Sequence, residues 1–116
     1  MTIKTFRDVA AQGDCFLYRV DVVPAGAKPA APQNGVYVVA HSETGHHHTV
    51  LERPSVRLFE DPADPLSAWL DVREPGHTLE HQRGFDNHKA LALPVGVFKV
   101  RRQREYTPEG FRRAQD

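Results

Sequence analysis

The sequence has little of what disulfide-rich, membrane-spanning or strongly charged proteins contain. Its 116 residues include one cysteine, so no internal disulfide can form. No apolar run approaches the roughly 18 residues that a membrane-spanning helix needs, and the first eight residues lack the apolar stretch of a signal peptide. Fifteen basic side chains balance fifteen acidic ones, so global charge favours neither nucleic acid nor a membrane surface as a partner. We therefore expect a reducing, cytoplasmic location and neither of those partners.

Long helical patterns are also missing, because nine prolines and eight glycines divide the chain into short pieces. These pieces are rich in Val, Phe, Tyr and Leu, which is typical of strands. The sequence predicts strands at 15–20, 36–39, 49–51, 56–59, 68–72, 78–81 and 97–100. The expected fold is all-β, a small barrel or sandwich of seven to eight short strands.

Other local signals complete a single β-domain over residues 1–116. Asn34-Gly35 is a tight-turn signal before the second predicted strand. Residues 24–34 hold three prolines and no strong apolar anchor, which favours an exposed loop. Thr107 and Pro108 form a helix-start pattern, so we expect one short terminal helix over residues 107–114. Cys15 lies in the most apolar predicted strand and should be a buried small side chain rather than a nucleophile.

The sequence lacks catalytic and metal-binding motifs with a distinctive spacing, such as HExxH and CxxC. It has seven histidines, however, and three of them are consecutive. Side chains alternate along a strand, so His46 and His48 should share one face and His47 the other. Two imidazoles spaced in this way can reach one ion. The competing interpretation is a solvent-facing polar hairpin tip.

Downstream histidines could complete a metal site. If residues 77–81 are extended, His77 and His81 share a face, and His88 follows after a polar stretch. A site of His46, His48, His81 and His88 suits zinc or another borderline divalent metal. No catalytic residue and no organic cofactor is expected.

Two short motifs resemble those of the cupin superfamily. His46-His47-His48 followed by Glu52 reproduces the H-x-H-and-acid spacing of its first motif. Pro94-Val95-Gly96 matches the P-x-G of its second motif, but Lys99 occupies the position of the ligand histidine. The resemblance implies a metal tetrad that only His81 or His88 could complete.

A second set of motifs spans most of the chain. It consists of Gln12-Gly13-Asp14, the turn 44–48 (TGHHH) and the segment 102–106 (RQREY). This ordered set resembles a group of small uncharacterised bacterial and phage proteins. The resemblance implies a common fold and a shared role for the histidine turn, with a virion as the alternative location if the chain is phage-derived.

The C-terminal segment is basic. Residues 96–116 carry six basic and three acidic side chains, a net charge of +3 that leaves −3 on the rest of the chain. Arg102 and Arg104 are two apart, so with Tyr106 they should share an exposed strand face. That face could contact an acidic protein partner or a second copy of the chain, or it could be only a solvated edge.

Three functions therefore remain open. The first is a non-catalytic accessory or interaction domain with a histidine-rich turn that binds a divalent metal. The second is a phage-related structural protein, such as a capsid decoration protein, and the third is a cupin-like metalloenzyme. The chain offers no obvious general base beside its histidines, so an enzyme is the least favoured of the three.

Overall fold

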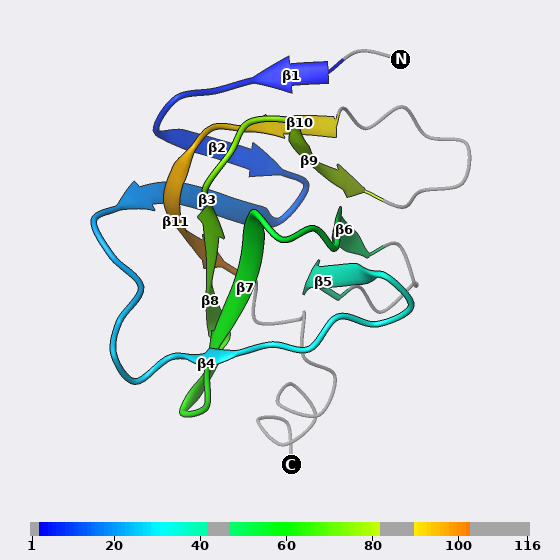
Figure 1. Ribbon diagram of the computed structural model, residues 1–116. Helices are drawn as coiled ribbons and strands as arrows, with labels where there is room; N and C mark the ends of the chain where they lie inside the picture. The colour runs from blue at the N-terminus through cyan, green and yellow to red at the C-terminus, as the bar shows by residue number, and fades with distance from the viewer. Residues whose placement is uncertain (1–2, 42–46, 82–89, 103–116) are drawn as a thin grey trace.

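The computed structural model describes residues 3–41, 47–81 and 90–102, and every regular element within them is a strand (Figure 1). The first sheet contains, in spatial order, β1 (Ile3–Thr5), β10 (Ala90–Leu93), β9 (His77–His81), β6 (His48–Leu51) and β5 (Val36–Ala40). The second contains β2 (Val9–Gln12), β3 (Cys15–Val20), β11 (Gly96–Arg101), β8 (Asp64–Val72), β7 (Val56–Asp61) and β4 (Lys28–Pro29). Among the strands described, β1 and β10 alone pair in parallel, and the other neighbouring strands pair antiparallel.

The all-β prediction is confirmed, and the two sheets do not close into a barrel within the described residues. The seven expected strands appear as β3, β5, β6, β7, β8, β9 and β11. Four further strands, β1, β2, β4 and β10, have two to four residues each and were not expected. The helix expected at 107–114 lies outside the described residues, and nothing in the part described is a helix that could span a membrane.

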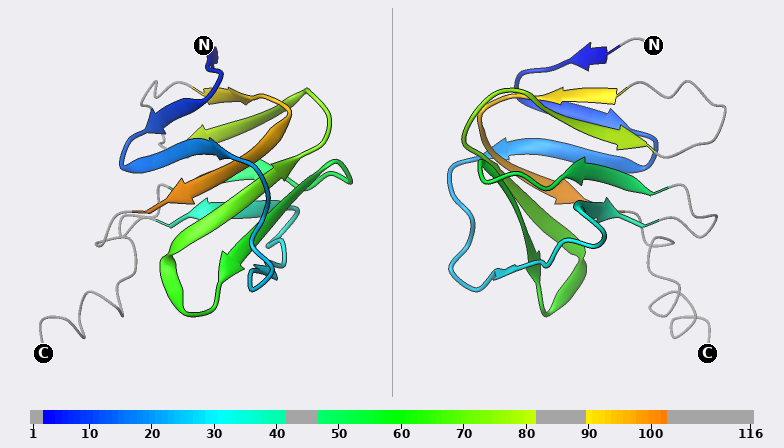
Figure 2. Two further views of the ribbon diagram at one scale, coloured as in Figure 1. Left: turned by 90° about the vertical axis from the view of Figure 1, so that its left-hand side faces the viewer. Right: turned by 45° about the vertical axis from the view of Figure 1, so that its right-hand side comes forward.

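The two sheets pack on one shared core. Leu17, Leu70 and Phe98 from the second sheet are fully buried, as are Leu79 and Leu91 from the first. Each such side chain stabilises the fold by roughly 1.5–3 kcal/mol through burial of apolar surface. The long β7–β8 hairpin extends beyond this core, and its turn projects from the body of the domain (Figures 1 and 2).

The loop at 24–34 is mostly exposed, as expected, but it contains a short strand. Lys28 and Pro29 pair with β7, and the amide of Ala30 donates to the Leu58 carbonyl at 2.8 Å. Pro29 is tolerated because β4 is an edge strand, where a missing N–H faces no partner. The Asn34-Gly35 turn forms as predicted, with φ values of 52° and 82° that suit a type I′ hairpin.

Cys15 is fully buried at the start of β3, which confirms the expected structural role. Burial is the main cause that raises the pKa of its thiol to about 12, so the reactive thiolate is scarce near neutral pH. We expect a thiol reagent such as DTNB to leave the native protein unmodified and to react fully once denaturant is added. Rapid stoichiometric reaction of the native protein would contradict this burial.

Candidate functional site

Two histidines that lie far apart in the sequence stack on each other. His48 begins β6 and His81 ends β9, and the register of the two strands places them directly opposite. Their ring centroids lie 4.1 Å apart with an interplanar angle of 7°. Side chains opposite each other in antiparallel strands have Cβ atoms about 5 Å apart, so the register itself produces the stack. His48 is buried and His81 is partly buried.

Gln12 fixes which nitrogen of His48 carries the proton. The Gln12 Nε2 amide donates to the Leu79 carbonyl at 2.9 Å, and a carbonyl can only accept. The Gln12 Oε1 atom therefore faces His48 Nδ1, at 2.7 Å, and must receive a proton from it. Neutral His48 consequently carries its proton on Nδ1, and its Nε2 keeps a lone pair.

The turn between β2 and β3 closes over the ring pair. Gly13 has a φ of 59°, a conformation that favours glycine, and a Cβ there would lie 3.5 Å from His48 Cε1 and 3.6 Å from His81 Cε1. The next residue, Asp14, places its Oδ1 3.8 Å from His48 Nε2, and its side chain is 63% exposed. In Figure 1 this turn lies beside the ends of β6 and β9. The turn thus brings a solvated carboxylate to the unprotonated nitrogen of a buried histidine.

As they lie, the two stacked rings do not converge on one ion. A ligand nitrogen binds a metal in the plane of its own ring, about 2 Å away. The plane of His81 runs nearly parallel to that of His48, so an ion held by one ring lies outside the plane of the other. Among the described residues no group of three or more histidine, cysteine or acidic side chains is placed to hold a metal ion.

The histidines other than His48 and His81 do not join this ring pair in the described part of the structure. His46 and His88, two of the expected ligands, lie outside the described residues. His47 packs edge-to-face on His41, with centroids 4.9 Å apart, whereas His48 contacts His81, so the two consecutive side chains have different neighbours. Residues 77–81 are extended as expected, but His77 bonds Ser55 Oγ at 2.7 Å, away from the ring pair.

Electrostatics around His41 disfavour its charged form. Burial is the largest cause that lowers the pKa of His41, and His47 and Arg102 lower it further. The carboxylate of Glu60 opposes them. His41 is therefore held in its neutral form more strongly than an exposed histidine would be.

The residues expected from the cupin-like motifs do not gather at His48. Glu52 follows β6 four residues after His48, about 13 Å along an extended chain. Lys99, at the position of the ligand histidine, lies over the Trp69 ring at 5.7 Å, and both pair within the second sheet. Gly96 sits next to the Val20 end of β3, opposite the end that carries Gln12.

The expectation that Arg102 lies on an exposed face is wrong. Its side chain is 2% exposed, and its Nε donates to the Val39 carbonyl at 2.8 Å. Its Nη1 and Nη2 donate to the Pro65 carbonyl at 3.0 Å and to Glu60 Oε2 at 2.9 Å. Arg102 therefore joins β5 to the β7–β8 hairpin. Arg104 and Tyr106 lie outside the described residues.

Sequence reasoning missed the role of Gln12 beside His48. A glutamine before Gly13-Asp14 looks like an ordinary hairpin residue, yet it is only 4% exposed. The available signal was the order of Gln12-Gly13-Asp14, the histidine turn and Arg102 along this chain, which the sequence analysis treated as one set of motifs. In the structure, the described parts of these motifs lie near one another: Gln12 contacts His48, and Arg102 bonds β5, the neighbour of β6.

Comparison with known proteins identifies a family but no activity. Residues 11–103 match a family described as Domain of unknown function (DUF8820). This range begins at the Gln12 turn and ends just after Arg102. No curated protein and no solved structure matches the chain significantly.

Proposed function

The chain belongs to this family of unknown function, and from the geometry of its site we propose that it is a non-catalytic domain that binds a divalent metal ion, with zinc as the favoured ion. His48 Nε2 and the Asp14 carboxylate are the donors that the described residues contribute. The ion would serve an accessory role, holding the histidine turn in the form that contacts a protein partner.

The fixed tautomer of His48 carries this proposal. Metal-binding histidines commonly donate their second ring N–H to a carbonyl or carboxylate, which orients the ring. Gln12 Oε1 accepts that proton here, and Leu79 holds the Gln12 amide in place. The Nε2 lone pair is thereby oriented without a metal, and orienting it costs nothing further on binding.

The separation of the two donors also suits a shared ion. A nitrogen and an oxygen bound to one tetrahedral zinc lie about 3.3 Å apart, given bonds of about 2 Å. His48 Nε2 and Asp14 Oδ1 are 3.8 Å apart, and the exposed Asp14 side chain can cover the difference. The sequence supplies His46 and His88 as the further ligands of this proposal. His81 supports His48 by stacking and would become a ligand only if its ring turned.

No specific observation in the described part of the structure favours either alternative function. The cupin-like site would need Glu52, or Lys99 at the position of the ligand histidine, near His48, and both lie elsewhere. A phage structural role and a contact through the basic C-terminal segment remain proposals from the sequence, and the latter loses Arg102 as an exposed contact residue.

Zinc titration of untagged protein by calorimetry tests the proposal. We expect saturable binding that weakens at least tenfold in Asp14→Asn and His46→Gln, since each variant removes one donor. His77→Gln, whose ring contacts Ser55, is the control and should bind as the wild type does. Affinity should fall as the pH drops through about 6.5, because protons compete for imidazole nitrogens. Binding that is absent, or unchanged in both donor variants, would exclude the site.

A further inference from the structure

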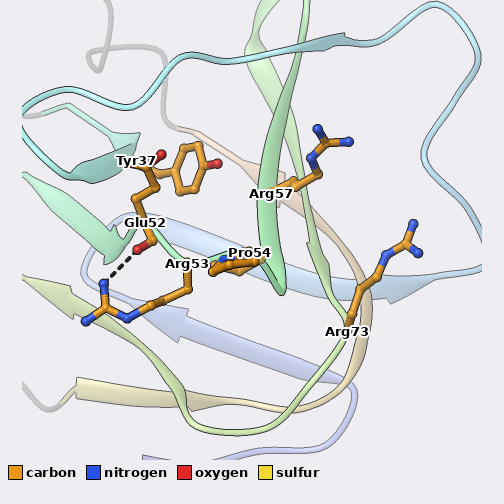
Figure 3. A pocket seen from close by; sticks show the side chains of 7 residues that line it. Tyr37, Glu52, Arg53, Pro54, Arg57 and Arg73 are labelled. Carbon is orange, nitrogen blue, oxygen red and sulfur yellow. Dashed lines mark hydrogen bonds between the residues drawn. The ribbon is translucent and has the colours of Figure 1, made fainter.

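A second site lies at the far end of β6 from His48. Here a hollow of about 630 Å³ is lined by Arg53, Arg57 and Arg73, with Tyr37 and Glu52 (Figure 3). Its size is within the range of small-molecule sites, which is roughly 300–1,000 Å³. Its lining contributes three guanidinium groups and one carboxylate, and Asp71 pairs with Arg73 beside it, although the chain as a whole has no net charge. The hollow therefore concentrates positive charge.

Backbone hydrogen bonds hold together the two segments that carry the arginines of this hollow. The amide of Val56 donates to the Arg53 carbonyl at 3.3 Å, which forms the turn into β7. The amide of Arg73 donates to the Ser55 carbonyl at 2.8 Å, which holds the end of β8 against that turn. The three arginines are thus held near one another by the fold and not by their own side chains.

The arginines keep most of their donors available. Arg73 uses Nε and Nη2 on Asp71, at 3.2 and 3.1 Å, and Arg53 uses Nη1 on the Glu52 carbonyl at 2.7 Å. Arg57 pairs in register with Asp71, yet its side chain makes no hydrogen bond or ion pair with any residue that the structure describes. A guanidinium has five N–H donors, so unused donors remain on all three.

The placement of the side chains gives the hollow two walls. Figure 3 shows Arg57 and Arg73 extending on one side and Arg53 on the other, with the Tyr37 hydroxyl directed towards Arg57. All three arginines are exposed, whereas the Tyr37 ring is buried. Arg57 and Arg73 thus present their guanidinium groups on the same side of the hollow.

We infer that this hollow binds the phosphate group of a small phosphate monoester. Arginine forks match phosphate oxygens in a bidentate manner, and such charge-assisted hydrogen bonds are stronger than neutral ones. A phosphate dianion would also offset the local excess of positive charge, three arginines against the carboxylates of Glu52 and Asp71. The remaining volume, beside the exposed Pro54, holds the organic part of the ester.

Calorimetric or NMR titration with inorganic phosphate and with phenyl phosphate, in a buffer free of other oxyanions, tests this inference. We expect saturable binding of both probes, tighter for phenyl phosphate, which fills more of the hollow. Arg57→Gln and Arg73→Gln should each weaken binding about tenfold or more, as expected for loss of a charge-assisted hydrogen bond. Arg57→Lys should also weaken it, because it keeps the charge but not the fork.

Controls separate a formed site from diffuse charge. Arg7, whose side chain is 91% exposed, lies outside the hollow, and Arg7→Gln should leave the affinity unchanged. The substituted residues are exposed, so unchanged thermal unfolding should accompany the loss of binding. Binding that is absent, that survives Arg57→Gln combined with Arg73→Gln, or that falls equally in Arg7→Gln would overturn the inference. Saturation by acetate with equal affinity would show a general carboxylate site instead and would also overturn it.

Discussion

Arg102→Ala is expected to lower the free energy of unfolding by roughly 3–5 kcal/mol, as for other buried charged groups that lose their partners. The substitution removes the donors to the Val39 and Pro65 carbonyls and leaves Glu60 without its guanidinium partner. Domains of this size have about 5–15 kcal/mol of stability, so the variant should lose a large share of it. Chemical denaturation followed by circular dichroism measures the change.

A neighbouring arginine provides the matched control. Arg101 precedes Arg102 but has a 48% exposed side chain that reaches Asp64 at 3.4 Å. Exposed ion pairs contribute at most about 1 kcal/mol, so Arg101→Ala should stay near wild-type stability. Arg102→Lys should fall between the two variants, since an ammonium keeps the charge but cannot span both carbonyls and Glu60 in the same plane. Equal effects of Arg101→Ala and Arg102→Ala would show that Arg102 is not a structural link.

The wrong prediction for Arg102 shows what the local sequence cannot indicate. The local sequence surrounds it with Arg101 and Arg104, and a basic run usually indicates a solvated surface. Its burial instead depends on carbonyl acceptors at Val39 and Pro65, which lie 63 and 37 residues away. Only the packing of β5 against the β7–β8 hairpin brings those acceptors together.

The strands that the sequence predicted differ from those that it did not predict in the same respect. Those with apolar side chains at their buried positions, such as β3 and β11, were predictable because burial of these side chains sets the pattern. The unexpected strands β1 and β4 are short and exposed along their length, and they owe their conformation to pairing with β10 and β7. Such pairing depends on distant segments and leaves no local periodicity.

The candidate site was only partly predictable. His48 and His81 were expected in one site, and the β6–β9 register does place them together. Their stacking was not expected, because ring orientation depends on which residues face each other across the strands. The contribution of Gln12 depends on an acceptor at Leu79, 67 residues away, which no spacing rule within the histidine turn could indicate.

The second large effect is expected for Gln12→Leu. Leucine keeps the approximate volume but removes the amide that bonds both Leu79 and His48. Loss of a buried hydrogen-bond partner costs about 1–3 kcal/mol for each group left behind, so for two groups we expect a loss of roughly 2–6 kcal/mol. Gln33→Leu is the control, because Gln33 is exposed and its hydrogen bonds to described residues are made by its backbone. Denaturant unfolding of both variants measures the difference.

The same variant tests the tautomer of His48 separately from stability. In the wild type, ¹⁵N NMR of the imidazole should show the proton on Nδ1, because Gln12 Oε1 accepts it. In Gln12→Leu that acceptor is gone, and the common Nε2–H form should become populated, with its proton directed towards Asp14. A proton on Nε2 must leave before a metal can bind, so zinc affinity should fall together with the Nδ1–H signal. A wild-type His48 that carries its proton on Nε2 would remove the observation on which the metal proposal depends, whatever the stability of the variant.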